Sequence, residues 1–326
     1  MHAGFATFLW MDDATTTKQI RRPRFHRASE PPPFRLTDDD LAIIRLVAQH
    51  RFLRSPQIAT LVGRSLDRTN DRLCRLFHAG YVDRPKAQLE YYPTKGSSPI
   101  VYALADLGAQ LLTQRDRMQP GNGEWGRKNR EAGRPFIDHQ LEITDFWVSL
   151  ERAAQGRTDV QLIHPDELIA TFPEQTRQAR SPLSMRVKLS DEGAEHEIGI
   201  VPDFAFGLRL AAGRRRCFMV EIDRGTMPIL RSDLRQTSFA RKMQGYLAAY
   251  AAKQHETRFG WKTFRVLTVT TDDQRMRSMQ EASRHLDVPN SPGAALFLFA
   301  TRSSLHTSDP LSHRWRDSNG SAVCLA

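Results

Sequence analysis

The apolar residues in the N-terminal third of the chain recur at the spacing of amphipathic helices. Three helices are predicted, over residues 37–50, 55–63 and 65–80. A Thr-Asp-Asp-Asp run can cap the first helix, and a Ser-Pro pair starts the second. The third helix is expected to bury Leu66 on the face opposite its arginines. The pattern therefore predicts a small helical unit.

A strand pattern follows these helices. Strands are expected over 89–92 and 100–104, joined by a turn that carries Lys95, and a further helix follows. Three helices and then a two-stranded wing is the order of a winged helix-turn-helix. Residues 101–108 also resemble the passage from wing to helix in such domains.

The third helix carries basic residues on its polar face. We expect this helix to enter the major groove of duplex DNA, with Arg68, Asn70 and Arg72 near the bases, while Lys95 contacts a phosphate. The full set of expected DNA contacts is Arg64, Arg68, Asn70, Arg72, Arg75 and Lys95. Two alternatives stay open: an ordinary solvated helix face, or a protein-interaction module.

Helix and strand patterns alternate in the rest of the chain and predict an α/β domain on a mixed central sheet. Helices are expected over 137–154, 234–252 and 275–285, and strands over 160–163, 185–189, 198–206, 218–222, 264–270 and 296–300. The overall fold class is α+β. The expected divisions are a disordered basic arm (1–35), the winged helix-turn-helix (36–114), a linker (115–134), the α/β domain (135–305) and a C-terminal tail (306–326).

Composition favours a polyanionic partner. The 326 residues include 47 Lys and Arg against 37 Asp and Glu, a formal net charge of +10, and cations that neutralise phosphates release counterions. Cys74, Cys217 and Cys324 stand far apart, which argues against a disulfide framework and fits a reducing cytoplasm. The apolar stretch 4–10 is too short to span a membrane and lacks the flanks of a signal peptide, and Met11 is a second candidate start.

Two acidic signatures stand where apolar strand runs end. Pro202-Asp203 closes the first run, and Glu221-Ile222-Asp223 closes the next. Mg²⁺ prefers oxygen ligands and is usually bound by one or two carboxylates together with substrate phosphates. The pattern therefore predicts a Mg²⁺ site for phosphodiester chemistry. The alternative is that these acids only cap or solvate turns.

An acidic helix, Pro-Asp on one strand, Glu-x-Asp on the next and then a lysine-bearing helix resemble the PD-(D/E)XK nuclease-like fold. The resemblance implies that Asp203 and Glu221 bind Mg²⁺ and that Glu142 on the preceding helix assists them. Asp223 stands where that family usually has a lysine that orients the attacking water. Lys242 on the following helix is the substitute that the resemblance suggests, with Asp223 as a second ligand or water contact.

The same region offers three further candidates. Asp145 is an alternative to Glu142, and His139 lies one helical turn before Glu142, so the two could reach one metal. A lone histidine on a half-buried helix is more often a structural hydrogen-bonding residue. Arg224, directly after Asp223, is a candidate phosphate ligand.

Taken together, the chain resembles the replication-relaxation family of plasmids and mobile elements. The resemblance rests on residues 36–112, 139–145, 201–203, 220–226 and 242–246. It implies a DNA-binding protein of plasmid replication or DNA mobilisation with a Mg²⁺-dependent endonuclease-like domain. A non-catalytic regulator that retains the fold, and a restriction or defence effector, are the alternatives. Expected partners are double-stranded DNA, a second copy of the chain and plasmid replication or relaxase proteins, with no membrane.

Overall fold

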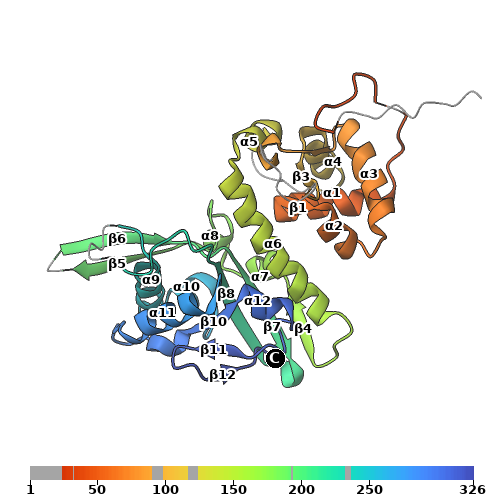
Figure 1. Ribbon diagram of the computed structural model, residues 1–326. Helices are drawn as coiled ribbons and strands as arrows, with labels where there is room; N and C mark the ends of the chain where they lie inside the picture. Colours follow the sequence, from red (N-terminus) through yellow and green to blue (C-terminus); the bar gives the residue numbers. More distant parts are fainter. Residues whose placement is uncertain (1–23, 32, 90–97, 117–123, 192–193, 232–235) are drawn as a thin grey trace, which may run out of the picture.

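The computed structural model describes residues 24–31, 33–89, 98–116, 124–191, 194–231 and 236–326. The fold is α+β, with a helical N-terminal unit and a second unit built on a mixed central sheet (Figure 1). Over the described residues, no helix combines the length and the apolar character needed to cross a membrane. Most of the predicted basic arm and the predicted wing tip with Lys95 lie outside the described residues.

The N-terminal unit packs helices against a small antiparallel sheet. Its elements are α1 (Asp38–His50), β1 (Phe52–Arg54), α2 (Ser55–Leu61), α3 (Leu66–His78), β2 (Val82–Asp83), a 3₁₀ turn (Lys86–Gln88), β3 (Val101–Leu104) and α4 (Asp106–Asp116). The strand order is β1-β3-β2. The predicted cap of α1 is confirmed, because Thr37 and Asp40 form a reciprocal capping box.

Two features of this unit differ from the sequence prediction. Leu66, expected to be buried, is 42% exposed because it lies at the first turn of α3, outside the reach of the core. The interval predicted as a linker contains α5 (Trp125–Glu131). Trp125 packs against the core of the N-terminal unit, and Arg51 lies 4.5 Å from its ring centroid. An aromatic anchor of this size keeps the segment on the unit.

Helix α6 (Arg134–Ala154) joins the two units (Figure 1). Near its start, Ile137 and Leu141 pack against Phe52 of β1. Further along, Phe146 and Leu150 belong to a core on the second sheet. Because one helix contributes to both cores, residues at its N-terminal end are placed beside the edge of the second sheet.

The central sheet has seven strands in the order β12-β11-β10-β9-β8-β7-β4. They are β4 (Val160–Ile163), β7 (Phe204–Leu210), β8 (Arg215–Ile222), β9 (Arg265–Thr270), β10 (Phe297–Thr301), β11 (Trp315–Asp317) and β12 (Ala322–Val323). Strands β8, β9 and β10 are parallel, and the other pairs are antiparallel. Helix α6 covers one face. The other face packs against α7 (Pro165–Ala170), α9 (Phe239–Ala251), α10 (Gln254–Phe259) and α11 (Asp273–Arg284).

The prediction of one strand over 198–206 is wrong. One strand ends at Ile200 and the next begins at Phe204. The first of these, β6 (Ala194–Ile200), pairs with β5 (Met185–Asp191) in a separate hairpin. This hairpin packs its apolar face on α9, where Gly245 leaves room for the side chain of Ile200. The Pro-Asp dipeptide therefore connects two sheets and does not end a strand.

The segment after residue 305, predicted as a tail, is part of the fold. It follows the short helix α12 (Arg302–His306) and supplies β11 and β12 to the central sheet. Trp315 is fully buried against Phe146 of α6, and Leu325 is buried in the same core. The second unit therefore extends beyond the predicted boundary, because this core needs Trp315 to cover α6.

Candidate functional site

Asp203 and Glu221 lie together at one edge of the central sheet. Asp203 immediately precedes β7, and the antiparallel register pairs Phe204 with Val220 of β8. The Asp203 amide donates to the Val220 carbonyl at 3.0 Å. Its carboxylate oxygen Oδ2 accepts from the Ile222 amide at 2.7 Å. Asp203 thus begins a strand instead of ending one, and antiparallel pairing still brings it to the expected place beside Glu221.

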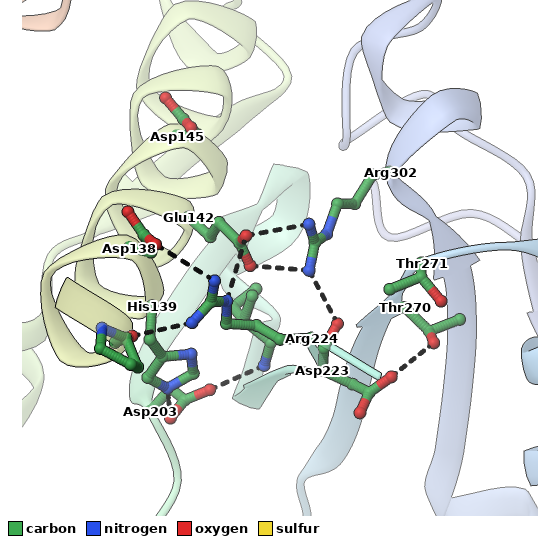
Figure 2. Close-up of polar contacts among 12 residues, drawn as sticks. Asp138, His139, Glu142, Asp145, Asp203, Asp223, Arg224, Thr270, Thr271 and Arg302 are labelled. Atoms are coloured by element: carbon green, nitrogen blue, oxygen red, sulfur yellow. Dashed lines mark hydrogen bonds and ion pairs between the residues drawn. The ribbon is translucent and has the colours of Figure 1, made fainter. Parts of the chain in front are cut away.

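His139 of α6 contacts Asp203 from the side. Its Nε2 lies 3.0 Å from Oδ1 of Asp203, and the side chains are 28% and 16% exposed (Figure 2). The hydrogen bond to Asp203 is the main cause of a raised pKa at His139, and burial opposes it. Asp203 therefore favours the imidazolium form, which in turn compensates the carboxylate charge.

Glu221 is buried among residues of α9. Lys242 makes an ion pair with its Oε2, and the Tyr246 hydroxyl donates to its Oε1. The residue is 4% exposed. Burial raises the pKa of Glu221 to about 7, although the Lys242 ammonium opposes the rise and nearby Asp203 adds to it. Since Lys242 and Tyr246 stand one helical turn apart, α9 presents both to the same carboxylate.

Asp223 and Glu142 are held by arginines. Arg275 of α11 binds Asp223 through two hydrogen bonds, of 2.6 and 2.8 Å, and the Thr270 hydroxyl adds a third at 2.7 Å. Glu142 lies between Arg302, at 2.7 Å, and Arg224, at 3.4 Å (Figure 2). Bidentate arginine pairs fix geometry as well as charge. Both acids therefore have well-defined partners in the protein.

Arg224 and Arg302 also connect the ion-pair network of Glu142 and Asp223 to backbone carbonyls. Arg224 donates to the Pro135 carbonyl at 2.8 Å, and Arg302 donates to the Asp223 carbonyl at 3.0 Å (Figure 2). Asp145 does not join it. Its carboxylate accepts from Gln57 at 2.6 Å and pairs with Arg54 at 3.0 Å, so it connects α6 to the N-terminal unit.

A cleft of about 490 Å³ brings most of the predicted site residues together. Its lining includes Asp203, Glu221, Asp223 and Lys242, with His139 and Arg224. Glu142 instead lines a smaller hollow of about 100 Å³ beside Arg302. Sequence reasoning missed Arg275 and Arg302. These partners lie 52 and 160 residues from the acids that they bind, and no local motif marks them.

The donor set of the cleft fits a metal site with two protein carboxylates. Within the described part of the chain, no three His, Cys, Asp or Glu side chains are grouped as metal ligands. Asp203 and Glu221 face one cleft, and Mg²⁺ takes one or two carboxylates with substrate oxygens completing the shell. Glu142 does not line this cleft, and Arg275 binds both oxygens of Asp223.

The predicted DNA-contacting residues on α3 and just before it are less free than the sequence suggested. Arg72 is paired with buried Asp40, Arg64 with Asp39 at 2.7 Å, and Arg75 with Asp71 at 2.9 Å. Arg68 and Asn70 are exposed, and Arg68 has no ion pair among the described residues. The polar face of α3 is therefore a mixed surface with one uncompensated arginine.

Fold and site together define a two-unit α+β protein that joins a small helical unit to a mixed-sheet unit with an acidic, lysine-bearing cleft. The chain belongs to the replication-relaxation family, whose model matches residues 44–263, more than half of its length. Membership indicates a role in the replication or relaxation of a plasmid or mobile element. No curated protein and no solved structure matches the chain.

Proposed function

We propose that this protein is a DNA-binding protein of a plasmid or mobile element that cuts a phosphodiester bond with Mg²⁺ in the cleft of its second unit. The observation that carries the proposal is the convergence of Asp203, Glu221 and Lys242 on one cleft from β7, β8 and α9. Two carboxylates with an adjacent ammonium are the groups that a PD-(D/E)XK nuclease-like site needs.

The N-terminal unit is proposed to be a winged helix-turn-helix that docks on duplex DNA. Three helices with an antiparallel sheet of order β1-β3-β2 support this assignment. Of the α3 residues, Arg68 and Asn70 are the proposed base contacts, because they are exposed. Lys95 is retained as a proposed phosphate contact. Plasmid replication or relaxase proteins and a second copy of the chain are further proposed partners.

Each residue of the cleft has a chemical role in this proposal. Bound Mg²⁺ would polarise the scissile phosphodiester and lower the pKa of its water. Asp203 and Glu221 would hold the cation, and Lys242 would orient the attacking water. His139 holds the Asp203 carboxylate in place at 3.0 Å. Arg224, which lines the same cleft, would bind a phosphate of the DNA strand.

The test is cleavage of supercoiled DNA with Mg²⁺, with Mn²⁺ and with chelator. The Asp203→Ala/Glu221→Ala protein should lose metal-dependent nicking by at least about 100-fold, in line with the loss of groups that act on the transition state. A Glu174→Ala/Glu195→Ala protein loses two exposed carboxylates elsewhere and should cut like the wild type. Wild-type protein that retards DNA without cutting it would overturn the nuclease assignment.

A non-catalytic regulator is the second candidate, and one observation favours it. Each of the acids Asp203, Glu221, Asp223 and Glu142 already contacts a histidine, lysine or arginine of the chain. Buried carboxylates are costly unless they are compensated, and here the protein itself supplies the cations. Retardation of DNA by both wild-type and Asp203→Ala/Glu221→Ala protein, without nicking by either, would support this function.

A further inference from the structure

Exposed cations gather at the end of the central sheet opposite the cleft. They stand on the end of β7, in the following turn, at the start of β8, and at and just before the start of β9. We call this surface the basic edge: Arg209, Arg214, Arg215, Arg216, Lys262 and Arg265, all of them exposed. Glu221 lies six positions after Arg215 along β8, so the two surfaces are about 20 Å apart.

Within the described part of the chain, none of these six cations has a carboxylate partner. Arg209 donates to the amide oxygen of Gln161 at 3.0 Å, and Arg216 donates to the carbonyl of Leu325 at 2.8 Å. Asp159, just before β4, is already paired with Arg157. The region of α3 differs, because acids pair with Arg64 just before this helix and with Arg72 and Arg75 on it.

The strand register brings like charges together. Arg209 of β7 stands directly opposite Arg215 of β8 in the antiparallel pair. Like charges at opposed positions of neighbouring strands destabilise a sheet. On the other side of the same edge, Arg216 and Arg265 line a hollow of about 350 Å³ with Phe218. In the free protein, the arginines of the basic edge therefore repel one another across two strands, and a hollow lies between two further guanidinium groups.

We propose that the basic edge is a second DNA-contact surface, which binds the phosphate backbone of a duplex away from both α3 and the cleft. A row of phosphates relieves the repulsion between the arginines, and the planar guanidinium fork matches a phosphate group. Phosphate contacts carry no sequence information, so this contact is independent of sequence. The proposal goes beyond the proposed function and shares with it only the identity of the ligand, duplex DNA.

The test measures the affinity for a short fluorescein-labelled duplex from about 50 mM to about 200 mM salt, using full-length protein. The variant is Arg209→Gln/Arg215→Gln. The matched control is Arg177→Gln/Arg180→Gln, which removes the same charge from exposed positions at and after α8 (Glu174–Arg177). Loss of two phosphate contacts should lower the steepness of log affinity against log salt by about 1.8. The loss of affinity between the two salt concentrations then becomes about 12-fold smaller than in the wild type.

The control should keep the wild-type slope. Equal slope changes in both variants would mean that only net charge matters. An unchanged slope in the Arg209→Gln/Arg215→Gln protein would mean that DNA does not contact the basic edge. Either result overturns the proposal. The urea midpoint of the variant should not fall, since opposed like charges are removed. A protein that cuts no DNA but loses slope only in this variant still supports the basic edge while overturning the nuclease assignment.

Discussion

Replacing Arg72 with alanine is expected to lower the free energy of unfolding of the N-terminal unit by about 2–4 kcal/mol. Arg72 donates from Nε to Oδ1 of Asp40 at 2.8 Å and from Nη2 to the other carboxylate oxygen. Asp40 is fully buried and forms the capping box of α1 with Thr37. The guanidinium also lies 4.8 Å from the ring centroid of Phe34. Arg72 thus fastens α3 to the start of α1.

The magnitude follows from what the substitution leaves behind. Removing one partner of a buried ion pair costs about 3–5 kcal/mol, because a charge stays buried without compensation. The Arg72 side chain is 25% exposed, so solvent screens part of the interaction and the ion pair itself should contribute less, about 2–3 kcal/mol. Hydrogen bonds from the Thr37 amide and hydroxyl, both at 2.8 Å, still satisfy Asp40 in the variant. Loss of the contact with Phe34 adds about 0.5–1 kcal/mol.

Urea unfolding followed by circular dichroism measures this difference. Arg68→Ala is the control, since Arg68 is an exposed neighbour on α3, and its change should stay within about 0.5 kcal/mol. Adding Asp40→Asn to Arg72→Ala should recover part of the loss, because the buried charge is removed. If Arg72→Ala were as mild as Arg68→Ala, Arg72 would be free for DNA and the structural assignment would be refuted. The Arg68→Ala protein should also bind its DNA site more weakly, by the about 1–3 kcal/mol that one bidentate base contact contributes.

Two further predictions concern packing and pH. In Gly245→Ala, the new Cβ would lie 2.6 Å from Cδ1 of Ile200. Overpacking should therefore lower the free energy of unfolding, measured in urea, by about 1–3 kcal/mol. An unchanged free energy of unfolding would mean that the β5–β6 hairpin moves freely on α9. Burial lowers the pKa of His50 to about 4 from an unfolded value near 6.5, so the folded state holds the neutral imidazole. Protonation at low pH therefore favours the unfolded state, and the free energy of unfolding should fall by about 2–3 kcal/mol as pH drops from about 7 to about 4.5. His50→Leu should remove most of this loss, and equal acid sensitivity in wild type and variant would contradict the assignment.

Much of the fold could be predicted because its signals are local. The capping residues before α1, the period of α6 and the apolar run of β4 each depend on neighbours in sequence. Other elements depend on long-range pairing. Strand β1 has three residues, too few for a pattern, and exists because it pairs with β3. Likewise β11 forms by pairing with β10, and β12 by pairing with β11.

The candidate site divides in the same way. Asp203 and Glu221 could be named from sequence, although Asp203 precedes β7 instead of ending a strand; they meet because antiparallel pairing places the start of β7 beside the end of β8. Lys242 could be chosen as the nearest lysine on the following helix, and it does contact Glu221. The pairing of Asp223 with Arg275 could not be foreseen. It depends on how α11 packs beside β9, and nothing in the acidic motif indicates that packing.

The partners of the four acids separate the site into an outer and an inner part. Arginine keeps its charge at any accessible pH and binds carboxylates through a rigid fork, so Asp223 and Glu142 are fixed by their partners. Asp203 contacts His139 and the Ile222 amide, and Glu221 contacts Lys242 and the Tyr246 hydroxyl; of these partners, histidine is the one that loses a proton near neutral pH. In the proposed reaction Asp203 and Glu221 would hold the cation and Lys242 would orient the water, while the ion pairs of Asp223 and Glu142 stay in place. Asp203 and Glu221 form the inner part of the site, and cleavage should depend on them. Asp223 belongs to the outer part, and the packing of α11 should depend on it.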